Sequence, residues 1–127
     1  MKLSNRHTLG LILVVAAILR FFQFSEIPFT HDEFSALFRL DFSTFSDLIE
    51  KGVMVDFHPA GVQVFLYYYT HWFGTQEWVV KLPFALMGLG SVWYMYKLGK
   101  LWFHETAGLL SAALLASIQY AVMYSQI

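Results

Sequence analysis

Three stretches of the chain are apolar and long enough to predict helices that cross a membrane. Residues 8–25 are interrupted only by Arg20, residues 78–98 carry charges only near their ends, and residues 106–127 carry none. At about 1.5 Å per residue, a helix over 8–25 reaches roughly 27 Å, close to the thickness of a bilayer core, and Arg20 is expected to snorkel to the interface. The sequence therefore predicts an all-α, polytopic membrane protein with three transmembrane helices.

A fourth apolar stretch, residues 60–73, is too short to predict a crossing. It reaches only about 21 Å, and it carries ring side chains that gather at headgroup level, such as His71 and Trp72. The positive-inside rule agrees, because it puts both the basic N-terminus and the turn with Lys97 and Lys100 in the cytoplasm. The chain must then cross the membrane an even number of times between them, and a crossing at 60–73 would make that number odd. We therefore expect an interfacial helix over 60–73 and a cytoplasmic N-terminus.

Residues 26–77 then form one large loop on the outer face, and this loop holds eight of the nine acidic residues. Within it, Thr30 and Glu33 have the spacing of a capping box, in which the hydroxyl and the carboxylate satisfy each other's backbone amides. This predicts a short helix that runs through Phe38.

Two further helices are expected in the loop. The first starts near Thr44 and stops at Gly52, because glycine is favoured at the residue that follows a helix. The second starts at His58 and Pro59, since proline loses nothing at the first helical position, and continues as the aromatic stretch.

The composition excludes several classes of protein. Hydrophobic residues make up 57% of the chain and charged residues 13%, against about 25% charged in soluble domains, so a soluble shell cannot be built. The net charge of −1 gives no reason to expect a nucleic-acid partner. The chain has no cysteine, which excludes a disulfide framework, a thiol nucleophile and cysteine-ligated metal sites.

Candidate chemistry gathers just beyond the first apolar stretch. Asp32 and Glu33 stand at a helix start close to the bilayer, where a carboxylate can act as a general base. Alternatively, Glu33 serves only the capping box and Asp32 is a solvated acid favoured by the helix dipole. Arg39 and Lys81 are cations near the outer face that suit a lipid phosphate, but snorkelling or pairing with the acids of the loop explains them equally well.

Metal binding is not supported by the sequence. The possible ligands His31, Asp56, His58 and His71 lack the short, fixed spacing of a zinc site. Nucleotide-binding and nucleophile-elbow motifs are also missing from the chain. No cofactor is therefore predicted.

The order of segments resembles the N-terminal part of the polytopic GT-C glycosyltransferases of the protein O-mannosyltransferase and aminoarabinose-transferase type. The resemblance covers residues 9–127. It depends on the following motifs in order: the Asp32-Glu33 pair, His58-Pro59, the segments 73–78, 81–86 and 98–103, and the ending Tyr124-Ser125-Gln126.

The resemblance implies transfer of a sugar from a polyprenyl-phosphate donor to an acceptor on the outer face of the membrane, with inversion at the anomeric carbon. The family's acidic pair maps onto Asp32 and Glu33 as the base on the acceptor, and its His-Pro motif maps onto His58 and Pro59. Phosphate contacts are expected from His58, Lys81 and Arg39. The acceptor, which is a lipid, a glycan or a protein, stays open.

The resemblance also implies a setting in the cytoplasmic membrane of a bacterium, and a larger protein of which this chain is a part. The chain departs from the family at Ala60, where a second proline is frequent, and at Lys81, where arginine is frequent. The alternative is a non-catalytic membrane scaffold whose acidic loop binds a partner.

Overall fold

A computed structural model describes residues 4–24, 26, 28–55 and 60–126, and throughout these residues the regular structure is helical, with no strand. The all-α prediction is confirmed. The chain divides into two units, the first made of Met1–Ile27 and Lys81–Ile127 and the second of Pro28–Val80. The outer loop predicted from the sequence, residues 26–77, has similar bounds to the second unit.

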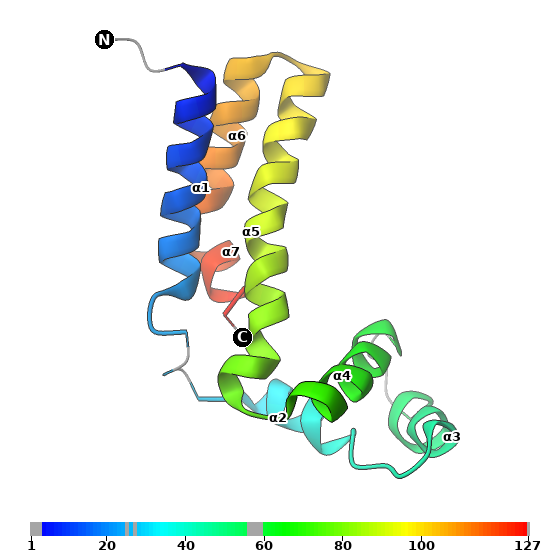
Figure 1. The fold of residues 1–127 in the computed structure, drawn as a ribbon. Helices are drawn as coiled ribbons and strands as arrows, with labels where there is room; N and C mark the ends of the chain where they lie inside the picture. The colour runs from blue at the N-terminus through cyan, green and yellow to red at the C-terminus, as the bar shows by residue number, and fades with distance from the viewer. Residues whose placement is uncertain (1–3, 25, 27, 56–59, 127) are drawn as a thin grey trace. The chain divides into compact units, whose positions relative to one another are not determined.

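The first unit is a bundle of long helices that lie side by side in Figure 1. They are α1 (Asn5–Phe21), α5 (Glu77–Trp102, whose first turn belongs to the second unit) and α6 (Glu105–Ser117), followed by the short α7 (Gln119–Met123). Their shared core consists of Ala16 from α1, Val92 and Tyr96 from α5, and Ala112 and Ala116 from α6.

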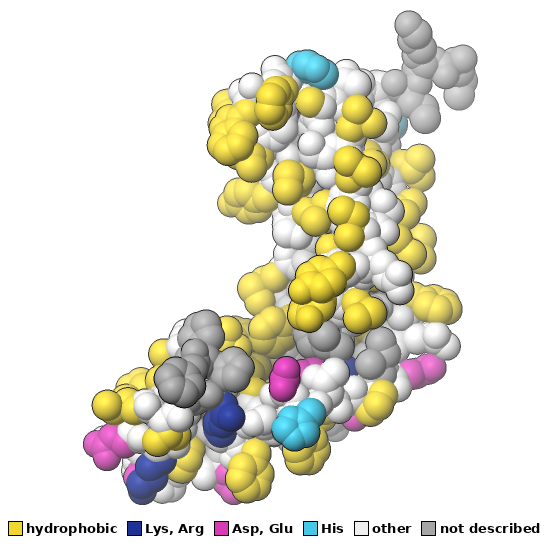
Figure 2. Space-filling model, turned by 180° about the vertical axis from the view of Figure 1, so that it is seen from behind, with side chains coloured by type: hydrophobic (Ala, Val, Ile, Leu, Met, Phe, Trp, Pro, Cys, Tyr) yellow, Lys and Arg dark blue, Asp and Glu magenta, His cyan; other side chains and the backbone are white. Residues whose placement is uncertain are grey.

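The outward faces of this bundle are apolar instead of polar. Leu11 and Ile18 of α1 and Leu110 and Leu114 of α6 are each about 60% exposed, and hydrophobic side chains cover the visible face of the long helices in Figure 2. Among the described residues, only α5 is both long and apolar enough to cross a membrane by itself. An apolar exterior around an apolar core is the arrangement expected in lipid.

The helix predicted over 106–127 is interrupted, because α6 ends at Ser117 and α7 begins at Gln119. Arg20 explains how this break is tolerated: its Nη1 and Nη2 donate to the carbonyls of Ala116 and Leu115, at 3.3 and 3.2 Å. These carbonyls lie in the last turn of α6, where no amide of the same helix reaches them. Arg20 is fully buried, so the expected snorkelling to the interface is wrong.

The end of α1 is capped in return. Gln126 Nε2 donates to the carbonyls of Leu19, Arg20 and Phe22, at 3.1–3.3 Å. Arg20 of α1 thus caps the end of α6, and Gln126, which follows α7, caps the end of α1. These contacts join residues about a hundred positions apart in the sequence.

Helices α5 and α6 approach each other at glycines. A Cβ atom on Gly108 would lie 2.5 Å from the carbonyl oxygen of Tyr96, and one on Gly99 would lie 2.9 Å from Gly108 Cα. The turn between the helices is fixed by Glu105, whose carboxylate accepts from the Tyr96 hydroxyl at 3.0 Å and pairs with Lys100 at 3.2 Å. Small residues at a helix crossing let the backbones meet, as they do in membrane bundles.

The second unit contains α2 (His31–Phe38), α3 (Phe45–Asp47), the π-helical segment η1 (Leu48–Val53) and α4 (Ala60–Phe73). The predicted start at Thr44 is confirmed, since its hydroxyl accepts from the Asp47 amide at 3.2 Å. Gly52 does not follow the helix as predicted but lies buried within η1. The site has little room for a larger residue, since a Cβ atom on Gly52 would lie 3.0 Å from the Phe42 ring. The predicted helix start at His58 and Pro59 lies outside the described residues.

Candidate functional site

The predicted capping box forms at the start of α2. The Thr30 amide and hydroxyl donate to Glu33 Oε2 at 2.7 and 2.8 Å, and the Glu33 amide donates to the Thr30 hydroxyl at 3.4 Å. This arrangement fixes where the helix begins and therefore which way its faces point. It also engages the Glu33 carboxylate. Of the two predicted bases, only Asp32 therefore has a carboxylate that is outside the capping box.

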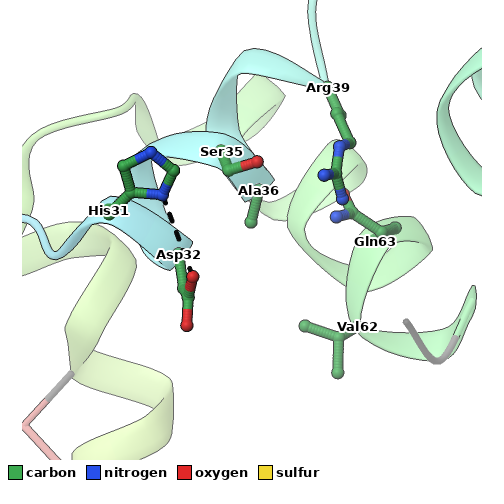
Figure 3. A pocket seen from close by; sticks show the side chains of 7 residues that line it. All are labelled: His31, Asp32, Ser35, Ala36, Arg39, Val62 and Gln63. Atoms are coloured by element: carbon green, nitrogen blue, oxygen red, sulfur yellow. Dashed lines mark ion pairs between the residues drawn. The ribbon is translucent and has the colours of Figure 1, made fainter. Parts of the chain in front are cut away.

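One face of α2 lines a cavity of about 310 Å³. Asp32, Ser35, Ala36 and Arg39 supply this wall, and Val62 and Gln63 of α4 lie across from them (Figure 3). Asp32, Ser35 and Ala36 lie in α2 and Arg39 caps its C-terminus, so the four follow the i, i+3, i+4, i+7 spacing of a single helix face. The helical period therefore brings Asp32 and Arg39, both predicted site residues, to the same cavity, whose size falls at the lower end of the roughly 300–1,000 Å³ of small-molecule sites.

Asp32 is open to an incoming group. Its side chain is 96% exposed, and its ionic neighbour is His31, with 4.0 Å between His31 Nδ1 and Asp32 Oδ1. A pair that is so exposed and so long contributes little energy. A ligand can therefore reach the carboxylate of Asp32 without breaking a strong interaction.

Gln63 is a cavity residue that sequence analysis missed. It is only 4% exposed, and its buried Oε1 has no hydrogen-bond partner among the residues that the structure describes. The only available signal was a glutamine at the fourth position of α4, in an otherwise apolar and aromatic helix start. That signal is weak, because a polar residue in an interfacial helix ordinarily faces water.

The other predicted residues are not part of this cavity. Lys81 lies in the first unit, in α5, where its side chain is fully buried. His58 and Asp56 lie outside the described residues. His71 is on α4, with its ring 5.7 Å from that of Tyr67. Within the described residues, no three His, Asp or Glu side chains come together as a group that could hold a metal ion.

A second, shallower cavity of about 260 Å³ lies on another face of α4. Its lining is almost entirely apolar and aromatic: Val64, Phe65, Tyr68, Tyr69, Trp72 and Phe73. Neighbouring rings are in contact along this face, with 5.3 Å between the centroids of Phe65 and Tyr69 and 4.9 Å between those of Tyr69 and Phe73. Such a face is typical of a helix that meets lipid headgroups.

An all-helical bundle with an apolar exterior is typical of a membrane protein, and one family model matches the chain. The sequence model of the dolichyl-phosphate-mannose-protein mannosyltransferase family matches residues 57–127. The match covers more than half of the chain, so the chain belongs to this family, as the resemblance to GT-C glycosyltransferases predicted. Searches of curated proteins and of solved structures found no match.

The family match includes some predicted site residues and not others. His58 and Lys81 fall within residues 57–127, whereas Asp32, Glu33 and Arg39 precede them. The assignment of Asp32, Glu33 and Arg39 therefore depends on the geometry of α2 and on the resemblance of the Asp32-Glu33 pair to the acidic pair of the family.

Proposed function

We propose that the chain is the N-terminal part of a membrane glycosyltransferase that moves a sugar from a polyprenyl-phosphate donor to an acceptor on the outer face of the cytoplasmic membrane. The observation that carries the proposal is the cavity in which an open carboxylate, Asp32, and a guanidinium, Arg39, share one face of α2. The family match supplies the class of donor.

The roles follow from the chemistry of the groups. The acceptor hydroxyl or amine attacks the anomeric carbon and gives its proton to Asp32. The bond between that carbon and the phosphate oxygen breaks, and its electron pair leaves with the lipid phosphate. A guanidinium binds phosphate through two parallel hydrogen bonds, so Arg39 stabilises the charge that develops on the leaving group. His58 and Lys81 are proposed as further phosphate contacts from the family resemblance.

The membrane arrangement belongs to the same proposal. Helix α5 has the length and apolarity for a crossing, and α1 and α6 share its core and present apolar side chains outward. We infer three crossings, by α1, α5 and the α6–α7 segment, with the N-terminus in the cytoplasm and the aromatic face of α4 at the outer headgroups.

The chain has no cysteine, so single cysteines report this topology directly. Cysteine at Ser46 or Thr75 is expected to react with an impermeant thiol reagent added to intact cells, whereas cysteine at Phe103 is expected to react only after lysis. Labelling of the Phe103→Cys variant in intact cells would overturn this arrangement of crossings.

The catalytic proposal is tested by Asp32→Asn in the complete protein. The substitution keeps the shape of the side chain and removes the base, so sugar transfer should fall by about 10²- to 10⁴-fold with expression and membrane insertion unchanged. Asp41→Asn is the matched control, because Asp41 is exposed and outside the cavity. Retained turnover in Asp32→Asn would remove Asp32 from the mechanism and would favour a non-catalytic scaffold with an acidic loop.

A further inference from the structure

Gln63 has a feature that packing alone does not explain. The residue is only 4% exposed, yet Oε1 makes no hydrogen bond within the described part of the chain. A buried acceptor without a partner is costly, and nearly all buried polar atoms in folded proteins are paired. Leucine or methionine would fill the same volume without this cost.

The unpaired atom belongs to a residue that lines the cavity of Asp32 and Arg39. Figure 3 shows that Gln63 reaches the cavity from α4 on the side of Arg39, whereas Asp32 stands at the other end of the wall that α2 supplies. The remaining lining side chains of this cavity, apart from His31 and Ser35, are the apolar Ala36 and Val62. A ligand that brings a hydrogen-bond donor to this wall would satisfy the buried acceptor oxygen of Gln63.

We propose that Gln63 recognises the sugar of the lipid-linked donor by accepting a hydrogen bond from a ring hydroxyl. The proposal rests on the proposed function. If Arg39 binds the lipid phosphate, the sugar, which is joined to that phosphate through one oxygen, comes to lie beside Gln63. The acceptor then approaches from the exposed side of the cavity, where Asp32 stands. Gln63 is a specificity residue for the donor and takes no part in proton transfer.

The test compares the affinity for sugar-linked and sugar-free lipid. The probes are undecaprenyl phosphate and its mannosyl, glucosyl and 4-amino-4-deoxyarabinosyl derivatives, titrated against the complete protein in nanodiscs. The sugar-dependent gain is the ratio of the Kd of undecaprenyl phosphate to the Kd of the tightest sugar-linked lipid. Loss of one neutral hydrogen bond should reduce this gain roughly 3- to 10-fold in Gln63→Leu and Gln63→Met, and leave the affinity for undecaprenyl phosphate unchanged.

Gln76→Leu is the matched control, because Gln76 undergoes the same chemical change in the second unit but is exposed, outside the cavity, and paired with the Trp78 indole N–H at 2.8 Å. Its sugar-dependent gain should equal that of the wild type. The Tm without ligand is the second readout. Gln63→Leu and Gln63→Met should match or exceed the wild-type Tm, because each removes an unpaired buried acceptor.

The outcomes separate this inference from the proposed function. If the wild type gains affinity from a sugar and both Gln63 variants keep that gain, the role of Gln63 is overturned and the proposed function stands. A fall in Tm with an unchanged gain shows that Gln63 is structural, and likewise overturns the inference. If the wild type binds none of the sugar-linked lipids better than undecaprenyl phosphate, the proposed donor is wrong and the inference fails with it.

Discussion

The two units of the chain use buried polar groups in opposite ways. In the first unit, Arg20 and Gln126 are buried, and Arg20 Nη1 and Nη2 and Gln126 Nε2 donate to backbone carbonyls at the ends of α6 and α1. Arg20 Nε alone of these groups has no partner among the described residues, on a side chain whose other donors complete the fold. In the second unit, Gln63 is as deeply buried as Gln126, but it lines a cavity and its acceptor oxygen has no partner among the described residues.

The difference follows from what each polar group can satisfy. A helix that ends inside an apolar bundle leaves carbonyls without donors, so a buried arginine or glutamine there completes the fold. A group that completes nothing in the fold is available to a ligand. The comparison teaches that burial of a polar side chain identifies a functional residue only when its hydrogen bonds have been counted.

Arg20→Met should have the largest effect on stability and should break the first unit. Methionine keeps much of the volume but leaves the carbonyls of Leu115 and Ala116 without donors, at a cost of about 3 kcal/mol. The measurement is thermal unfolding of the complete protein in detergent. Arg6→Met is the control, since Arg6 lies on the same helix and is exposed. Equal Tm values for the two variants would contradict the capping role of Arg20.

Gly108→Ala should have the next largest effect on stability. Its Cβ would lie 2.5 Å from the Tyr96 carbonyl oxygen, so the helices must separate, and overpacking of this kind costs about 2 kcal/mol. Gly90→Ala is the matched control in α5, because a Cβ there meets nothing within 4 Å. Alanine is a better helix former than glycine, so this control should raise the Tm slightly. If Gly108→Ala and Gly90→Ala both raised or both lowered the Tm, α5 and α6 would not meet closely at Gly108.

The smallest effect is expected in the second unit, at an exposed pair. A hydrogen bond from Lys51, together with one from the Thr44 hydroxyl and the charge of Lys51, holds the pKa of Asp47 below its usual value. The folded state therefore binds fewer protons than the unfolded state near the ordinary aspartate pKa of about 3.9. The stabilisation is present above that pH and is lost as the pH falls through the folded-state value.

Carbon-13 NMR of the Asp47 carboxyl group measures this midpoint. Lys51→Gln should move it upward toward the ordinary value, whereas Lys97→Gln, which removes a lysine elsewhere, should leave it unchanged. An Asp47 midpoint that is the same in wild type and Lys51→Gln would contradict the pairing. Added salt should weaken the effect, because the pair is exposed.

Local parts of the fold could be predicted from the sequence because their causes are local. The capping box at Thr30 and Glu33 and the helix start at Thr44 depend on side chains that reach backbone amides three residues away. The placement of Asp32 and Arg39 on one face follows from the helical period. The apolar stretches likewise predict helices, although they do not predict where α6 breaks.

The sequence by itself determined that this protein is helical and apolar, that short helices begin after Thr30 and Thr44, and that the helical period aligns Asp32 with Arg39. Only the tertiary structure decided that Arg20 is buried at the end of α6, that Gly108 meets α5, and that Gln63 lines the cavity with an unpaired oxygen. The reason is physical. Capping and periodicity act between neighbours along the chain, whereas burial and the pairing of a polar atom depend on segments that folding brings together from positions far apart in the sequence.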